Sequence, residues 1–149
     1  GSSTDNDFAI TGVQLEVGEY TSSTIPPFQF ESFGDNFMRC ARYYYKIASG
    51  SNQTLAIGYY KADDQWRMTS YLPCQPRTAP TLDYVSGTDY YINDMYGVDD
   101  AINSWSRTRA STSTAQVTHN SSESSGTMGM AGETLTNNSA AYFAWTMEL

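Results

Sequence analysis

The chain has 149 residues, enough for one domain with a core of its own, and 40% of them are hydrophobic. Its formal net charge is -8, from 8 basic and 16 acidic residues. So few basic residues leave no patch that could neutralise phosphates, which argues against nucleic acid and against an anionic membrane surface as partners. No apolar run approaches the ~20 residues that a transmembrane helix needs.

The N-terminal part is predicted to be a strand followed by a connector. Apolar and polar residues alternate along residues 4–18, which is typical of a half-buried strand. The two prolines at 26–27 then fix an extended segment that can neither continue a sheet nor lie inside a helix. We therefore expect residues 1–31 to form a strand and connector, and residues 32–149 to form a single domain.

One helix is predicted, beginning after Ser32 and ending near Ala41. The Ser32 hydroxyl suits a helix N-cap, and Asp35 stands three residues later in the position of a capping-box acid. From Phe33 onwards, apolar residues recur at i, i+4, i+7 and i+8, which is one face of a helix. Cys40 belongs to that face, so we expect its thiol to be buried and free.

The remaining chain reads as short strands separated by turns, which predicts a mainly β protein. The predicted strands cover residues 42–48, 54–62, 66–72, 81–85, 89–93, 112–119, 127–130 and 141–149. The fold class expected from this pattern is an antiparallel β-sandwich with one short N-terminal α-helix.

Turn residues predict how some of these strands are connected. A hairpin is expected across residues 63–64, and a second across residues 86–88. Prolines confine residues 73–80 to a crossing or a sheet edge. Residues 94–110 are expected to be irregular, with one helical turn.

Candidates for catalysis are sparse. His119 is the only histidine and no Gly-x-Ser-x-Gly elbow accompanies it, so a lone loop histidine is the simpler interpretation. The acids at 63–64, 94 and 99–100 could supply a glycosidase carboxylate pair or oxygen ligands for calcium. Acids at turns more often solvate a loop, and the EF-hand spacing is missing. These residues offer no basis for an enzyme, a cofactor or a metal site.

The aromatic residues are more informative, because 12 tyrosines and 3 tryptophans exceed the needs of one small sandwich core. Adjacent tyrosines point to opposite faces of a strand, so each group places at least one ring away from a one-sided core. Such rings suit a subunit interface and a sugar-binding surface equally well, while a sheet covered on both faces is the plainer alternative. The candidate ligand-binding residues are Tyr59, Trp66, Tyr90 and Trp105, and the candidate interface residues are Phe37, Arg42, Tyr44 and Tyr45.

Residues 10–46 carry a resemblance to a known family. The order ITGVQLEVG, then the crossing PPFQFESFGD, then RCARYYYK resembles a module of bacteriophage tail-fibre and other virion appendage proteins. A later Pro-rich strand entry at 72–81 and a final strand ending in Glu148 and Leu149 follow the family's order. The crossing is longer than in the family, and residues 89–139 match nothing in it.

The resemblance implies a homotrimeric appendage tip, made in the host bacterial cytoplasm and located in the virion beside other tail proteins. It implies attachment to host-surface polysaccharide or a protein receptor, where repetition around a three-fold axis adds avidity. It also implies that the first strand closes a preceding domain. The alternative is a purely structural virion component. Attachment predicts exposed Trp66, Trp105 or loop tyrosines, whereas the structural alternative predicts the same rings buried between chains.

Overall fold

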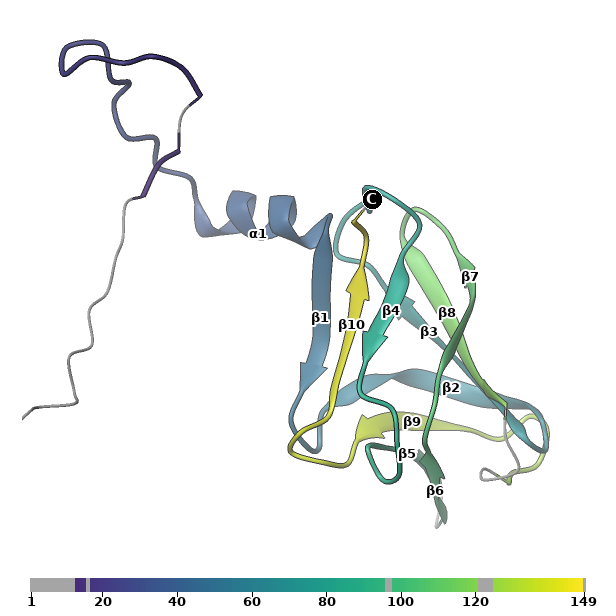
Figure 1. Ribbon diagram of the computed structural model, residues 1–149. Coiled ribbons are helices and arrows are strands. Elements are labelled where there is room, and N and C mark those ends of the chain that lie inside the picture. Colours follow the sequence, from purple (N-terminus) through teal and green to yellow (C-terminus); the bar gives the residue numbers. More distant parts are fainter. Residues whose placement is uncertain (1–12, 16, 96–97, 121–124, 149) are drawn as a thin grey trace, which may run out of the picture.

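The computed structural model describes residues 13–15, 17–95, 98–120 and 125–148 (Figure 1). This part of the chain contains one helix, α1 (Phe33–Ala41), followed by ten strands. The strands are β1 (Tyr44–Ser49), β2 (Thr54–Ala62), β3 (Gln65–Tyr71), β4 (Thr81–Tyr84), β5 (Tyr91–Met95), β6 (Val98–Ile102), β7 (Ser106–Ala110), β8 (Thr114–Asn120), β9 (Ala131–Thr136) and β10 (Tyr142–Thr146). The prediction of a mainly β protein with one short N-terminal helix is confirmed.

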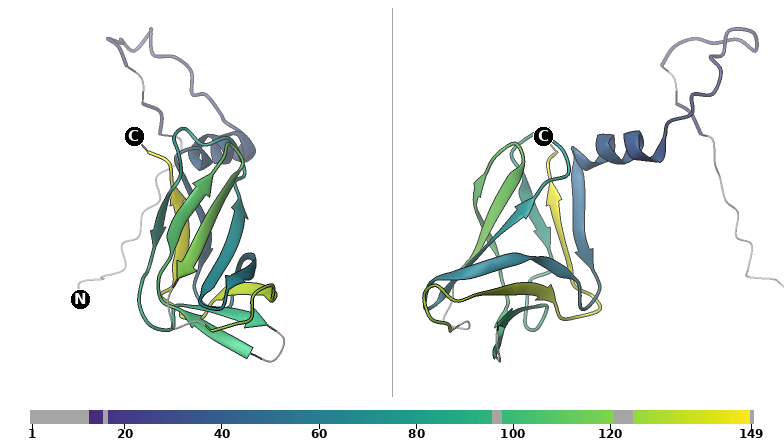
Figure 2. Two further views of the ribbon diagram at one scale, coloured as in Figure 1. Left: turned by 90° about the vertical axis from the view of Figure 1, so that its right-hand side faces the viewer. Right: turned by 180° about the vertical axis from the view of Figure 1, so that it is seen from behind.

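The strands form two antiparallel sheets, which we call the body. The three-stranded sheet has the order β1-β10-β4, and the seven-stranded sheet has the order β6-β5-β9-β2-β3-β8-β7. In the views of Figures 1 and 2, β2 and β9 run across the end of the body that lies away from α1, steeply inclined to β1 and β10. The two sheets enclose one hydrophobic core to which both contribute side chains.

The centre of the core is aromatic. The ring of Phe143 lies 5.8–6.3 Å, centroid to centroid, from the rings of Tyr84, Tyr91, Trp105 and Trp145. Four of these five rings are at most 4% exposed, and the fifth, Tyr84, is half-buried. Because these residues come from both sheets, the cluster is completed within a single chain. Burial of each such ring stabilises the fold by about 1.5–3 kcal/mol.

The first predicted hairpin is confirmed and the second is wrong. Tyr60 of β2 lies opposite Trp66 of β3 across the predicted turn. By contrast, β4 pairs with β10 in one sheet and β5 pairs with β6 and β9 in the other. The turn between β4 and β5 does contain backbone of positive φ, at Gly87 and Asp89, as a hairpin turn would. Here that turn carries the chain from one sheet to the other.

Two other expectations about the chain also need correction. Residues 94–110 are not irregular, because β5 extends to Met95 and is followed by β6 and β7. Residues 127–130 form a turn rather than a strand, and β9 begins only at Ala131. The missed strands are polar: β7 is exposed along its whole length, so its sequence lacks the apolar alternation that signals a half-buried strand.

The predicted crossing at 73–80 is confirmed, since it holds no strand and joins the seven-stranded sheet to the three-stranded sheet. Most of the predicted first strand, residues 4–18, lies outside the described residues. Its described positions form no strand, and Val13, Leu15 and Val17 are 76%, 92% and 96% exposed.

Candidate subunit interface

The helix α1 begins and ends where the sequence predicts. Ser32 has extended backbone and its hydroxyl accepts a hydrogen bond from the Asp35 amide at 3.1 Å, which is the N-cap contact. The same hydroxyl donates to the Asp35 carboxylate at 2.7 Å. The cap therefore satisfies one of the free amides of the first helical turn and fixes the start of the helix.

The apolar face of α1 is left uncovered by the body. Ala41 is its only buried residue, whereas Phe33 is 86% exposed and Phe37 is 41% exposed. The prediction that Cys40 is buried is wrong: its thiol is free but exposed, and it donates to the Asn36 side-chain oxygen at 3.3 Å. The physical reason is the position of α1, which projects from the end of β1 instead of lying across a sheet (Figure 1).

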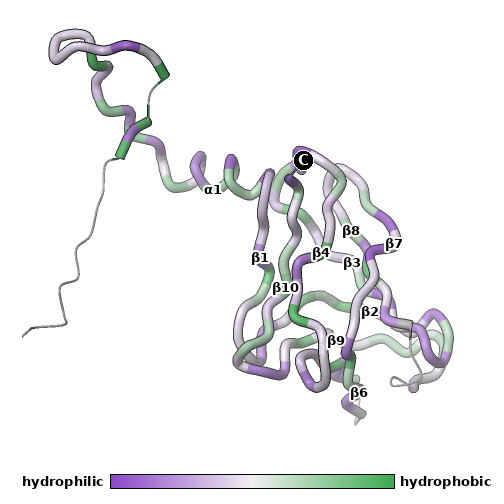
Figure 3. The backbone as a smooth tube through the Cα atoms, in the orientation of Figure 1, coloured by the Kyte–Doolittle hydropathy of each residue, from purple (hydrophilic) through white to green (hydrophobic). Residues whose placement is uncertain are grey.

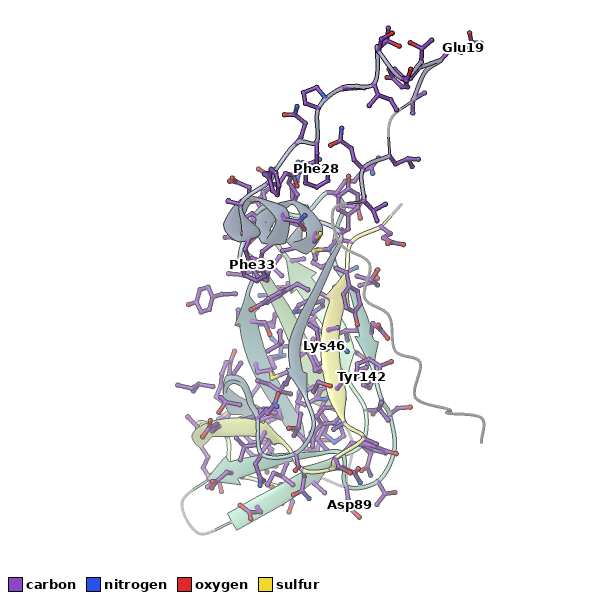
Figure 4. The ribbon with its side chains drawn as sticks, turned by 90° about the vertical axis from the view of Figure 1, so that its left-hand side faces the viewer. Glu19, Phe28, Phe33, Lys46, Asp89 and Tyr142 are labelled. Atoms are coloured by element: carbon purple, nitrogen blue, oxygen red, sulfur yellow. The ribbon has the colours of Figure 1, made fainter. Side chains whose placement is uncertain are left out.

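Residues just before and after α1 extend this apolar region. Phe30 is 91% exposed, and its ring meets that of Phe28 edge to face at 4.7 Å. Figure 4 shows Phe28 and Phe33 beside α1. We define the α1 surface as the exposed apolar residues Ile25, Phe28, Phe30, Phe33, Phe37, Met38, Tyr43 and Tyr44. At ~200 Å² for each aromatic side chain, its six aromatic residues expose about 700 Å².

A hollow of about 560 Å³ lies on another side of the helix. It is lined by Phe30, Met38 and Cys74 together with the polar and charged side chains of Glu31, Ser32, Asp35, Arg39 and Arg42. Met38 follows Phe33 by five residues, which places the two about 140° apart around the helix axis. The Cys74 thiol donates to the Met38 carbonyl at 3.4 Å and so joins the 73–80 crossing to α1. The α1 region thus has a projecting aromatic face and a separate concave face.

Three of the eight basic residues of this acidic chain gather at the same end. Arg39 forms an ion pair with Glu31. The Arg77 guanidinium lies 5.2 Å from the centroid of the Tyr43 ring and donates to the Tyr43 hydroxyl at 3.3 Å. Arg42 is exposed, and no carboxylate among the described residues pairs with it. An unpaired guanidinium therefore stands at the rim of the hollow.

The structure brings the four predicted interface residues together. The Phe37 ring contacts the Tyr45 ring at 6.4 Å, at the junction of α1 and β1. Tyr44 is 40% exposed and Arg42 is also exposed, while Tyr45 is half-buried and packs against the core. Tyr44 and Tyr45 point to opposite faces of β1, so Phe37 and Tyr45 meet on one side of the strand and Tyr44 lies on the other.

The four predicted ligand-binding residues are scattered. Trp66 is fully buried and donates from its indole nitrogen to the Thr134 hydroxyl at 2.9 Å, and Trp105 is only 4% exposed. The expectation that these two rings are exposed for a ligand is therefore wrong. They are buried within one chain, not between chains. Tyr90 packs partly against the core, and only Tyr59, 43% exposed on β2, is open to solvent.

Sequence reasoning missed two aromatic features of the sheets. One is Tyr71, which is 79% exposed at the end of β3. The other is a cluster on the three-stranded sheet, in which the Asp83 carboxylate accepts hydrogen bonds from the hydroxyls of Tyr44 at 3.1 Å and Tyr142 at 2.9 Å. The ammonium group of Lys46 lies 5.4 Å from the centroid of the Tyr142 ring (Figure 4). The cluster ties together β1, β10 and β4.

The Asp83 carboxylate also changes the acidity of the two phenols. Its hydrogen bond is the main factor that raises the pKa of Tyr142 above the usual 10.0. Burial raises the pKa of Tyr44, and the hydrogen bond to Asp83 adds to that effect. Both phenols are therefore held in their neutral, hydrogen-bond-donating form.

His119 is not a loop residue. It lies on β8, is 1% exposed, and places its ring 6.3 Å from that of Trp105. Its Nδ1 lies 2.8 Å from the Ser104 carbonyl oxygen, which assigns the proton to Nδ1, and its Nε2 has no hydrogen-bond partner among the described residues. Within the described part of the chain this ring makes one hydrogen bond, to a backbone carbonyl, which is typical of a packing residue.

The acidic candidates occupy strands as well as turns. Asp94 of β5 lies opposite Asp99 of β6, and the Asp100 carboxylate accepts a hydrogen bond from the Tyr60 hydroxyl at 2.6 Å. Within the ranges that the structure describes, no three His, Cys, Asp or Glu residues gather where they could hold a metal ion.

Among the described residues, no helix has the length and the apolar character that crossing a membrane requires. Comparison of the chain with family models, with curated proteins and with solved structures found no match.

Proposed function

We propose that this chain is the tip module of a bacteriophage tail fibre or a similar virion appendage. In this proposal it is a β-sandwich that assembles as a homotrimer, joins other tail proteins and attaches the particle to glycan on the host surface. No catalytic role is assigned to it.

The observation that carries the proposal is the uneven distribution of exposed apolar side chains. Twelve of the sixteen large exposed hydrophobic residues lie within residues 13–44, and four lie in the rest of the described chain. Figure 3 shows the hydropathy along the chain, and Figure 4 places Glu19 of the N-terminal segment and Asp89 of the body at opposite ends of the molecule. A subunit with one apolar end and a polar body suits a module that is held at one end and displayed at the other.

The outer face of the seven-stranded sheet supplies the proposed glycan contact. Tyr59 of β2 lies opposite Arg67 of β3, and Tyr71 follows on the same face of β3 because side chains alternate along a strand. A tyrosine offers apolar area with a polar tip, and Arg67 and Thr69 between the two rings add hydrogen-bonding groups. Repetition of this face around a three-fold axis would raise the avidity of weak sugar contacts.

Binding of the intact assembly to arrays of bacterial surface polysaccharides tests the proposal. Tyr59→Ala and Tyr71→Ala should each weaken binding by about tenfold, the size expected when a contact worth ~1.4 kcal/mol is lost. The matched control is Tyr20→Ala, since Tyr20 is 41% exposed but lies in the N-terminal segment. Binding that is unchanged by both sheet variants would contradict this assignment of the glycan surface.

The burial of Trp66 and Trp105 in the core favours a second candidate, a purely structural virion component, because it removes two of the four predicted ligand contacts. A component of that kind would still assemble through the α1 surface. It would bind neither a glycan on the array nor intact host cells, and that pair of results would replace the attachment proposal.

A further inference from the structure

We infer that a second copy of this chain covers the α1 surface in a head-to-tail contact. The Phe33–Phe37 face of one subunit enters the hollow lined by Phe30, Met38 and Cys74 on the next subunit. This inference rests on the assembly part of the proposed function and specifies which surfaces meet. It does not depend on glycan binding.

The helix α1 needs a second layer to cover it. A helix of nine residues is shorter than the ~12–15 residues at which isolated helices become even marginally stable in water, so packing of its apolar face must stabilise it. The body buries only Ala41, and the nearest ring contact is Phe37 with Tyr45. Phe33 remains 86% exposed, and Phe37 and Met38 remain more than 40% exposed.

The exposed area fits a specific interface. Summed over the helix and the residues on either side of it, the six aromatic residues of the α1 surface expose about 700 Å² at ~200 Å² each. This area approaches the ~800 Å² that each partner contributes to a standard interface. Phenylalanine, tyrosine, methionine and arginine, which make up most of this region, are also the residues enriched at interface centres.

The chain itself carries both halves of the contact, which identifies the occupant as a second copy. A projecting aromatic pair, Phe33 and Phe37, stands on one side of α1, and a hollow of about 560 Å³ stands on another. The hollow is also lined by both signs of charge, from Glu31, Asp35, Arg39 and Arg42.

The contact is head-to-tail because the proposed assembly is a homotrimer. Phe33 and Met38 are separated by about 140° around the helix, so the projecting face and the hollow are distinct surfaces. A contact between distinct surfaces that repeats in one direction around a three-fold axis closes into a ring, whereas two chains related by a two-fold axis would exchange face and hollow reciprocally. A ring of three is the smallest closed assembly in which the contact runs in one direction.

Two variants separate the halves of the contact. Phe33→Asp removes the projecting ring at the first helical position, where an acid interacts favourably with the helix dipole. Met38→Arg fills the hollow with a longer, charged side chain while keeping a strong helix former. The matched control is Ile57→Thr, which alters a residue that is 77% exposed on the body and retains β-branching.

Light scattering at low micromolar concentration gives the readout. Each variant alone should have the mass of one 16.5-kDa chain, and the control should keep the mass of the unaltered protein. An equimolar mixture of the two variants should give particles of twice the chain mass, because the intact face of Met38→Arg still enters the intact hollow of Phe33→Asp. Far-UV circular dichroism and tryptophan emission should show that both variants retain the body.

Different results would overturn the contact, the ring and the attachment proposal. A mixture that remains at one chain mass would overturn the match of face and hollow, and a two-chain particle formed by the unaltered protein would overturn the head-to-tail ring. If the masses follow the expected pattern while the glycan arrays stay blank, the inference stands and the attachment proposal falls.

Discussion

The core of the body and the α1 surface are both rich in aromatic residues, yet their exposure is opposite. Phe143 is fully buried among four other rings, while Phe33, on an equally regular apolar face, is 86% exposed. The difference lies in what stands opposite each face. The inner face of β10 meets a second sheet of the same chain, whereas α1 meets no second layer. Periodicity therefore identifies a face that must be covered, but not the chain that covers it.

The largest effect that would test this contrast is expected in the core. Phe143→Ala should lower the free energy of unfolding by about 3–5 kcal/mol, because it removes a fully buried ring and leaves a cavity. Urea denaturation measures the change. Under conditions where the protein is a single chain, Phe33→Ala should change the same free energy by less than about 0.5 kcal/mol. Equal losses of unfolding free energy at Phe143 and Phe33 would show that the two rings are equally covered within one chain.

Substitutions at two glycines test the contrast between the core of the body and α1 further. A methyl group at Gly58 of β2 would lie 2.5 Å from the Arg67 carbonyl oxygen and 2.6 Å from the Trp66 indole, so Gly58→Ala should destabilise the protein by about 1–3 kcal/mol. At Gly34 of α1 the same methyl meets nothing nearer than the Ser32 hydroxyl at 3.9 Å. Gly34→Ala should therefore stabilise the helix by about 0.5–1 kcal/mol. Thermal unfolding of both variants checks the two opposite signs.

Removal of the N-cap of α1 should destabilise the helix alone. Ser32→Ala removes the hydroxyl that accepts from the Asp35 amide, and loss of such a cap costs about 1 kcal/mol of helix stability. Because α1 packs weakly on the body, the change should appear in hydrogen exchange of the α1 amides and not in those of β10. Faster exchange throughout the body would show that α1 belongs to the same cooperative unit as the core.

The smallest effect concerns alkaline pH. The pKa values of Tyr44 and Tyr142 are raised in the folded protein, so the stability that these groups contribute is present below pH 10.0 and is lost as the pH rises through their folded values. Asp83→Asn removes the carboxylate that raises the pKa of Tyr142, and both phenols should then ionise nearer pH 10.0. Tyrosinate absorbance follows the titration. An unchanged titration curve would show that Asp83 does not raise the pKa of either phenol.

Much of the fold was predictable because local signals dominate there. Ser32 and Asp35 predict the start of α1, and the acidic turn at residues 63–64 predicts the hairpin of β2 and β3. The strands β6 and β7 were missed because their sequences are polar and their apolar alternation is weak. The partner of β4 was also missed, since turn chemistry reports that the chain turns and not which strand it joins.

The candidate site was predictable only in part, for a related reason. Alternation places Trp66 and Arg67 on opposite faces of β3, but it does not reveal which face the three-stranded sheet covers. Trp66 was therefore assigned to a surface although it is buried, while Tyr71 was overlooked although it is exposed. The predicted interface residues Phe37, Arg42, Tyr44 and Tyr45 are close together in the sequence, so they necessarily lie at one end of the body, and their role in an interface stays a prediction.

The mass of the purified chain by light scattering at low micromolar concentration tests most directly whether a second copy covers α1. We predict three times the 16.5-kDa chain mass, with Phe33 and Phe37 protected inside the particle. A particle with the mass of one chain at that concentration, folded and with α1 intact by circular dichroism, would contradict the assembly.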